Sequence, residues 1–432
     1  MKVKIKTLGC KVNYVESLAL EEMLLQAGFD VVEEEDCDIF ILNSCSVTNE
    51  SDKKSRQALS RNRKINPENY AVIMGCYSQV SKNELLENQN VNLVSGNRDK
   101  LEIVELLQQQ RELLEKDRVK DISRYRVFEQ LPFHGLGSKT RGFIKIQDGC
   151  DNYCTYCIIP HARGRVRSRE LDFIEEEARH LYEQGTQEIV VTGIEVASYG
   201  KDLDQVQLID AIEATAKGAP GIRIRMSSLE IGCITEDFLQ RVKNIPGFCH
   251  HFHLSLQSGC DKILKKMGRK YTTDIFAKKV ELIRKYFPYA GLTSDVIVGF
   301  PYETEEDFDT TCQYVQAIGL LRIHVFPYSP RKNTPAARMP QIDGTIKTER
   351  AKKLRDISEQ LERDFQRNIL GKPQEVLIEE RRNGIFYGYT SNYVRVELST
   401  NENKDLKLNQ VYTVLPKAKG DDIQWTVFSA KS

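Results

Sequence analysis

The chain has 432 residues, 40% hydrophobic and 29% charged, which excludes a disordered or fibrous protein and predicts about two to four domains. Lysine plus arginine and aspartate plus glutamate total 62 each, so any nucleic-acid contact must come from local patches. The opening MKVKIKTLGC lacks an apolar leader, and no stretch approaches the roughly 18 apolar residues of a membrane span, so we expect a cytoplasmic protein without membrane contact. Eleven cysteines in uneven clusters favour metal or redox chemistry over disulfides.

Residues 1–112 alternate short apolar runs with helical patterns, which predicts an α/β domain with a parallel sheet. The runs VKIKTL, DIFILN and YAVIMG are each followed closely by a cysteine: Cys10, Cys45 and Cys76. Because ligands gather at the carboxyl ends of parallel strands, we expect these three thiols to converge on one site. A single cysteine beside a strand is commonly only a small buried residue, but three at equivalent places favour a ligand set.

Residues 113–138 are charged and irregular and are interpreted as a linker. Residues 139–369 return to α/β alternation, with strand-like runs GFIKIQ, EIVVTG, IRIRMSS, HFHLSL, LTSDVIVGF and LRIHVF. Six such units predict a partial (β/α)6 barrel, whose functional residues should follow the strands. A long charged helix, about residues 348–370, ends before Gly371 and Pro373.

Residues 370–432 change to a period of two, with five β-type runs that predict a small antiparallel β-barrel. Small barrels of this kind commonly bind single-stranded nucleic acid through aromatic and basic side chains, and Tyr393 and Arg395 are candidates. A solvated β surface predicts the same residue types, so both interpretations stay open.

The strongest local signal is GCDNYCTYC, in which Cys150, Cys154 and Cys157 follow a predicted strand in the spacing C-x3-C-x2-C. Zinc prefers four closed ligands, and no second cysteine pair lies nearby, so structural zinc is the weaker interpretation. Three thiolates suit a [4Fe–4S] cluster with one iron left open for another ligand. With Tyr156 as its aromatic residue, the motif resembles the radical S-adenosylmethionine (SAM) superfamily, in which the open iron holds SAM and releases a 5′-deoxyadenosyl radical.

With TLGCKVN, NSCSVT and MGCY before it and a terminal small barrel after it, the chain resembles the radical SAM methylthiotransferases. This resemblance implies two [4Fe–4S] clusters, an auxiliary one on Cys10, Cys45 and Cys76, and a terminal TRAM domain that binds RNA. It also implies two uses of SAM, as methyl donor to a sulfur on the auxiliary cluster and as radical source.

TLGCKVNYVES resembles the branch that acts on N6-threonylcarbamoyladenosine at position 37 of tRNA, and the expected product is its 2-methylthio derivative. Isopentenyladenosine-37 tRNA and ribosomal protein S12 are alternative substrates within the family, and a non-catalytic Fe–S electron carrier is the alternative from another class. The expected partners are a tRNA anticodon loop, a sulfur donor and a flavodoxin- or ferredoxin-type reductant, and we expect a monomer.

Residues that follow the predicted barrel strands, and Tyr156 beside the cluster, are the candidates for cofactor contacts: Tyr156, Glu195, Ser228, Glu230, Gln257 and Asp295. Ser228 and Gln257 could instead cap turns. Arg163, Arg165 and Arg167 alternate after the cluster loop, as Arg169 does, and could hold anticodon-loop phosphates; a solvated strand face is the alternative. Where the family has GFPGET this chain has Tyr302, and Ser44 replaces a commoner threonine. No function is assigned to the other cysteines, Cys37, Cys233, Cys249, Cys260 and Cys312.

Overall fold

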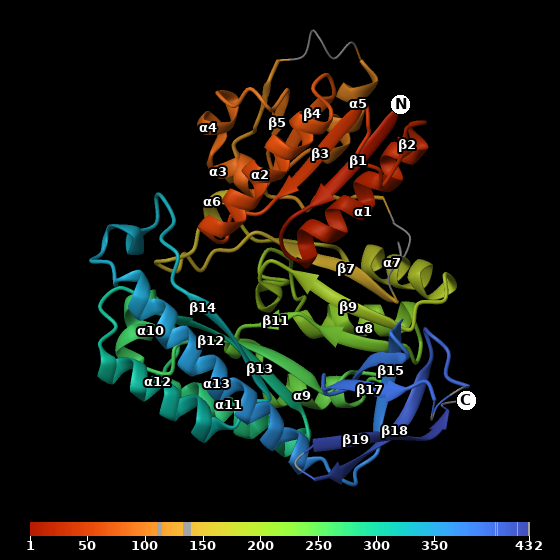
Figure 1. Cartoon of the computed structure of the whole chain (residues 1–432), viewed down its shortest axis with the longest axis vertical. Helices are drawn as coiled ribbons and strands as arrows, with labels where there is room; N and C mark the ends of the chain where they lie inside the picture. The colour runs from red at the N-terminus through yellow and green to blue at the C-terminus, as the bar shows by residue number, and fades with distance from the viewer. Residues whose placement is uncertain (110–114, 133–139, 402, 404, 421, 431–432) are drawn as a thin grey trace.

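The computed structural model describes residues 1–109, 115–132, 140–401, 403, 405–420 and 422–430. Three parts follow one another along the chain: an N-terminal sheet at the top of Figure 1, a central partial barrel and a C-terminal sheet at the lower right. Among the described residues no helix combines the length and the apolar character that a membrane span requires.

The N-terminal part is a six-stranded parallel sheet in the order β2-β1-β3-β4-β5-β6. Its strands are β1 (Lys2–Thr7), β2 (Asp30–Val31), β3 (Ile39–Ser44), β4 (Tyr70–Gly75), β5 (Leu93–Ser95) and β6 (Asp117–Arg118). Strand β3 is buried on both faces because its alternate side chains enter two separate apolar clusters. The predicted parallel sheet is confirmed, but residues 117–118, which we placed in a linker, form its edge strand.

Five helices cover the two faces of this sheet: α1 (Lys11–Gln26), α2 (Asn49–Ile65), α3 (Cys76–Val80), α4 (Lys82–Leu86) and α5 (Lys100–Gln108). Helices α1 and α5 pack on one face, and α2 and α4 on the other. Thr48 begins α2 by accepting a hydrogen bond from the Ser51 amide, and acidic residues follow in the first turn. A short 3-10 turn (Ile122–Arg124) then leads toward the barrel.

The central part consists of two four-stranded sheets, β10-β9-β7-β8 and β11-β12-β13-β14, and only the β7–β8 pair is antiparallel. The strands are β7 (Arg141–Asp148), β8 (Arg167–Ser168), β9 (Glu188–Gly193), β10 (Arg223–Met226), β11 (Ser228–Leu229), β12 (His251–Gln257), β13 (Gly291–Val298) and β14 (Arg322–Pro327). All six predicted strands are present. The third is divided at Ser227, so its first half pairs with β9 and its second half with β12.

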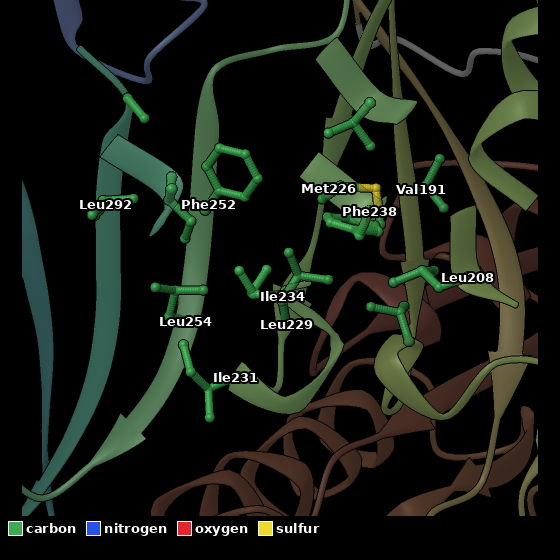
Figure 2. Close-up of a cluster of buried hydrophobic side chains, with 14 of the residues drawn as sticks. Val191, Leu208, Met226, Leu229, Ile231, Ile234, Phe238, Phe252, Leu254 and Leu292 are labelled. Atoms are coloured by element: carbon green, nitrogen blue, oxygen red, sulfur yellow. The ribbon is translucent and has the colours of Figure 1, made fainter. Parts of the chain in front are cut away.

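The helices of the central part cover the outer face of the strands, except α6, which lies against α3 of the N-terminal part. They are α6 (Ile159–Arg163), α7 (Leu171–Glu183), α8 (Leu208–Gly218), α9 (Glu236–Lys243), α10 (Asp261–Met267), α11 (Thr273–Tyr286), α12 (Glu305–Ile318) and α13 (Gly344–Asn368), with 3-10 turns at Val196–Ser198, Ile231–Cys233 and Pro335–Arg338. Side chains such as Phe252, Leu254 and Leu292 form the core between strands and helices, as Figure 2 shows. The alternate residues of β12, such as His253 and Gln257, point to the opposite, inner face.

The C-terminal part is a five-stranded antiparallel sheet in the order β17-β16-β15-β18-β19. The strands β15 (Gln374–Arg382), β16 (Ile385–Thr390), β17 (Arg395–Ser399), β18 (Val411–Lys419) and β19 (Asp422–Ala430) match the five predicted runs. Alternate residues such as Val376, Val396 and Trp425 enclose a core. The edge strands β17 and β19 lie on two sides of a cavity of about 540 Å³ that Glu362 and Gln366 of α13 also line.

Candidate active site

The first cysteine set lies where three neighbouring parallel strands end. Cys10 follows β1 and precedes α1, Cys45 follows β3, and Cys76 begins α3 directly after β4. A Cβ added to Gly9 would lie 3.0 Å from the Cys45 Cβ, so the first two loops are in close contact. Burial raises the pKa of the Cys45 thiol to about 11, and Cys76 and Cys10 add to this rise. The structure therefore brings the three thiols together, as the strand pattern predicted.

Amide side chains hold the loops of this first set. The Asn13 Oδ1 accepts a hydrogen bond from the Cys10 Sγ at 3.2 Å. The Asn13 Nδ2 donates to the Asn43 Oδ1 at 2.8 Å and to the Ser44 carbonyl at 3.0 Å. Asn13, Asn43 and Ser44 are all fully buried, so the bonds among them are shielded from water, whereas Cys10 itself is exposed. The thiol positions are consequently fixed by the fold and not by surface loops.

The second set lies on the single loop after β7. Gly149 has φ +75°, and a Cβ there would lie 1.8 Å from the Arg165 carbonyl, so only glycine fits before Cys150. The Cys150 amide donates to the Gly164 carbonyl at 3.0 Å, which closes the loop. Burial raises the pKa of Cys150 and Cys157 to about 12, and the Cys154 thiol adds to the rise at both. The three sulfurs are therefore close neighbours in a protected pocket.

Arg269 is a functional candidate that the sequence analysis missed. Its Nη1 donates to the Cys154 Sγ at 3.4 Å, and its Nη2 lies 4.0 Å from the Glu230 Oε1. The residue belongs to the stretch MGRKYT, which lies between the fourth and fifth predicted barrel strands and to which the sequence analysis assigned no function. The guanidinium is therefore placed to balance the negative charge of an iron-bound Cys154 thiolate.

The donor atoms of both sets fit a cluster better than a single metal ion. Within the described ranges, no three histidine, cysteine or acidic side chains lie close enough to hold one ion. A cubane cluster uses a different iron for each cysteine, so its thiolates stand farther apart than the ligands of one zinc. Because burial raises the pKa of Cys45, Cys150 and Cys157, cluster binding must release protons from these thiols.

A cavity of about 230 Å³ lies between the second set and the loop that follows Cys45. Val47 and Thr48, just after Cys45, line one side, and Tyr156 and Cys157 line another. The remaining wall comes from the inner face of the barrel and includes Gln257, Asp295, Ile297 and Phe326. Of the predicted cofactor residues, Tyr156, Gln257 and Asp295 therefore meet at one cavity. Gln257 has φ +68°, an unusual conformation for this residue type that ends β12 at the cavity wall.

Glu195 and Glu230 lie together beside the second set. Burial raises the pKa of Glu195 to about 7, and the neighbouring Glu230 carboxylate contributes. The Asn152 Nδ2 reaches the Glu195 Oε2 at 3.5 Å, and the Gln147 Oε1 accepts the Glu195 amide at 2.8 Å. Ser228 is exposed at the start of β11. Their contact with a cofactor stays a prediction.

The structure contradicts the surface roles expected for the alternating arginines. Arg163 is fully buried, Arg167 is 1% exposed and Arg169 is 4% exposed, so none of them presents its guanidinium to RNA phosphates. Carboxylates bind them instead: Glu16 and Asp148 contact Arg163, Asp148 contacts Arg167, and Glu177 contacts Arg169. The alternative of a solvated strand face is also wrong for these three residues. Arg165 alone is exposed, 3.7 Å from Asp151.

Tyr393 and Arg395 lie in different surroundings. Tyr393 stacks on His251 of β12 with ring centres 4.4 Å apart and on Tyr389 at 4.9 Å, so it joins the C-terminal sheet to the barrel. The Arg225 guanidinium also lies over its ring, 4.8 Å from the centre. Arg395 is exposed, with its guanidinium 4.7 Å from the centre of the Tyr387 ring. RNA binding by either residue stays a prediction.

Two family models match the chain. The radical SAM superfamily matches residues 144–315, and the model described as uncharacterized protein family UPF0004 matches residues 2–96. The radical SAM model covers most of the barrel and the second cysteine set, and the UPF0004 model covers the first set. Membership of the radical SAM superfamily implies one [4Fe–4S] cluster and SAM, which agrees with the donor atoms around Cys150, Cys154 and Cys157.

The solved structures that resemble this chain are radical SAM enzymes. The methyltransferase TsrM from Kitasatospora setae matches with a TM-score of 0.58 at 16% identity, over 78% of this chain and 77% of that one. The cobalamin-dependent enzyme OxsB matches with a TM-score of 0.52 at 11% identity, over 83% of this chain and 56% of that one. At these identities the likeness shows the fold alone.

Similar proteins of known name extend over nearly the whole chain. The Bacillus subtilis threonylcarbamoyladenosine tRNA methylthiotransferase MtaB is 37% identical over 420 residues, which is 95% of this chain and 93% of that protein. The Thermotoga maritima protein of the same name is 36% identical, over 92% of each chain. The Natranaerobius thermophilus tRNA-2-methylthio-N(6)-dimethylallyladenosine synthase is 36% identical, over 86% of this chain and 84% of that one. The chain therefore belongs to the radical SAM tRNA methylthiotransferase family.

Proposed function

We propose that the protein converts N6-threonylcarbamoyladenosine at position 37 of tRNA to its 2-methylthio derivative. The observation that carries this proposal is the cavity between two separate sets of three thiols, because sulfur insertion needs a sulfur source and a radical source at one carbon. The two similar proteins named MtaB support the choice of substrate.

We infer two clusters, one held by Cys150, Cys154 and Cys157 and an auxiliary one held by Cys10, Cys45 and Cys76. When bound, the clusters and SAM supply the methylthio group and the 5′-deoxyadenosyl radical that removes hydrogen from C2 of the adenine. A sulfur donor and a flavodoxin- or ferredoxin-type reductant complete the proposed system, in which the protein acts as a monomer.

The cavity residues would orient the base and exclude water. Ile297 and Phe326 present apolar surface to the cavity, which suits an adenine ring and protects a radical from solvent. The Asp295 Oδ2 lies 3.2 Å from the His253 Nε2, so its carboxylate is held on the barrel wall. The Gln257 amide offers both a donor and an acceptor at the end of the neighbouring strand.

Lys11 supports a substrate that carries an anionic group. Although solvent reaches its side chain, the surrounding protein lowers its pKa by desolvation, and Arg141 and Arg225 add to this effect. Its charge also acts on His251 and His324, so the ammonium lies near the inner face of several barrel strands. In the described part of the chain the carboxylate that acts most on Lys11 is Glu188, which Arg141, Arg223 and Arg225 already bind, so Lys11 lacks an ion-pair partner of its own. The threonyl carboxylate would supply one, whereas an isopentenyl group would not.

The isopentenyl alternative has one specific support, the similar synthase from Natranaerobius. Anaerobic reconstitution with reductant and SAM, followed by mass spectrometry of nucleosides, distinguishes the two. We expect a methylthio gain on tRNA that carries threonylcarbamoyladenosine and none on isopentenyladenosine tRNA. The reverse result would contradict the proposed substrate. Deoxyadenosine formation without either product would direct attention to ribosomal protein S12, and absence of SAM cleavage to an electron carrier.

Cysteine variants test the division between the two sets. Cys154→Ala should abolish deoxyadenosine and product, whereas Cys76→Ala should abolish product alone. Cys312→Ala is the matched control, because Cys312 is a buried cysteine of α12 that belongs to neither set. A Cys76→Ala variant that still inserts sulfur would show that the auxiliary site is misplaced.

A further inference from the structure

Arg163 connects the two cysteine sets. It is the last residue of α6, the short helix that follows Cys157, so the chain delivers it from the radical SAM loop. Its side chain is fully buried and extends into the N-terminal part of the protein. Such a buried guanidinium needs partners for most of its five N–H groups, and the structure supplies them.

The contacts of Arg163 on the N-terminal side reach the first cysteine set. Its Nε donates to the Cys76 Sγ at 3.3 Å. Its Nη2 donates to the Asn13 Oδ1 at 3.2 Å, the same oxygen that accepts from the Cys10 Sγ. Both Nη atoms bind the Glu16 carboxylate, at 2.5 and 3.1 Å, in a bidentate pair. One residue of the barrel thus touches one cysteine of the first set directly and a second one through Asn13.

The contacts on the other side reach the start of the second cysteine loop. The Arg163 Nη1 lies 3.5 Å from the Asp148 Oδ2, and the Asp148 Oδ1 accepts the Gly149 amide at 2.8 Å, next to Cys150. The Arg167 Nη2 donates to the Arg163 carbonyl at 2.9 Å and holds the turn. Arg163 therefore fixes the loop of one set against the loops of the other.

The charges around Arg163 leave an excess of positive charge beside Cys76. Glu16, Asp148 and Glu129 are the carboxylates of this buried cluster, and its cations are Arg163, Arg167, Lys100 and Lys145. Four cations and three carboxylates leave a net charge of about +1, which favours one further negative charge nearby. The thiolate of Cys76, which Arg163 contacts, would supply that charge. In a site of low dielectric constant such a charge and hydrogen bond favour the more negative, reduced state of a cluster.

We propose that Arg163 is a positioning residue of the auxiliary cluster, which it holds against the radical SAM loop and whose reduction potential it raises through its hydrogen bond to Cys76. The inference rests on the proposed function, because it requires the auxiliary cluster. It concerns no residue of the substrate cavity.

The test uses two backgrounds that each keep one cluster. In the Cys150→Ala, Cys154→Ala, Cys157→Ala background only the auxiliary cluster remains, and Arg163→Gln should shift its midpoint in an EPR redox titration to lower potential. Iron loss to a chelator should become roughly tenfold faster, as is typical when a partner of a metal ligand is removed. Arg163→Lys keeps the positive charge but lacks the planar set of guanidinium donors. We expect it to show a smaller midpoint shift and a smaller increase in iron loss than Arg163→Gln.

In the Cys10→Ala, Cys45→Ala, Cys76→Ala background the radical SAM cluster should keep its midpoint when Arg163 is changed to Gln. Arg165→Gln is the matched control in both backgrounds, because Arg165 is on the same loop and exposed. An unchanged auxiliary midpoint would overturn the inference, and so would equal shifts in both backgrounds, which would indicate a general loss of fold. Absence of iron from the auxiliary-only parent would instead overturn the proposed second cluster, and the inference with it.

Discussion

Arg331 and Asp52 form an ion pair of 2.6 Å that joins the barrel to helix α2 of the N-terminal part. Both side chains are mostly buried, and the same Arg331 Nη2 also donates to the Ser46 Oγ at 2.7 Å, next to Cys45. Asp52→Ala leaves this guanidinium buried without its anion, so we expect the free energy of unfolding to fall by about 3 kcal/mol or more. Urea denaturation of the cluster-free protein measures the loss.

The control for this variant is an exposed pair of similar length. Lys353 and Asp309 lie 2.7 Å apart on the surface, with about half of each side chain exposed. Asp309→Ala should change the free energy of unfolding by less than about 1 kcal/mol, because solvent screens the pair. Equal losses of unfolding free energy for Asp52→Ala and Asp309→Ala would show that burial does not increase the contribution of the Arg331–Asp52 pair to stability.

Glu195 should make the stability of the cluster-free protein depend on pH. Because burial and Glu230 raise its folded pKa from 4.5 to about 7, its ionised form disfavours the fold. Its contribution to stability is fully present below about pH 4.5 and is lost as the pH rises to about 7. Glu195→Gln should match the parent near pH 4 and exceed it at pH 8 by up to about 3 kcal/mol. Denaturation series at both pH values would contradict this if the difference stayed constant.

Lys11→Gln should reduce kcat/KM for tRNA carrying threonylcarbamoyladenosine by about tenfold, since it removes one charge-assisted contact with the carboxylate. Iron analysis must show full cluster content, because Cys10 is adjacent. Lys53→Gln, an exposed lysine of α2, is the control and should leave kcat/KM unchanged. An unchanged kcat/KM in the Lys11 variant would remove Lys11 from substrate recognition.

Arg395→Gln should weaken tRNA binding and reduce the slope of log K against log salt by about one, the expectation for one lost phosphate contact. Arg179→Gln, an exposed arginine of α7, provides the comparison. Fluorescence anisotropy at several salt concentrations measures both variants. If the two slopes are the same as that of the parent, Arg395 does not contact the backbone of the RNA.

The sequence was sufficient for the positions of most strands and for the two cysteine sets, because short-range patterns determine both. Strands β1, β3 and β4 of the first sheet are local apolar runs, each followed within a few residues by a cysteine, whereas the two-residue strands β2 and β6 carry no such pattern. The five C-terminal strands were equally visible from their period of two. The separation of β10 from β11 at Ser227 depends on which strand each half meets, so it had no local signal.

The buried charges were missed because their partners are distant in sequence. Arg163 meets Glu16 and Lys145 meets the same carboxylate, across intervals that no local pattern spans. One signal was present: Glu16 lies on the buried face of α1 among apolar residues such as Val12 and Leu20, where a carboxylate requires an internal cation. A charged residue at a core position of a helix thus indicates that a partner exists, but it does not identify that partner.

The placement of Arg163 has a consequence for the order of events during synthesis. The radical SAM set lies within one short loop, whereas the first set draws on three strands and needs loops of some thirty residues to close. Arg163, which contacts Cys76 of the first set, is translated much later than the strands of this sheet. The strands of the first sheet therefore leave the ribosome before Arg163 has been synthesised. A nascent chain that stops before α6 would carry the three thiols without the contact from Arg163.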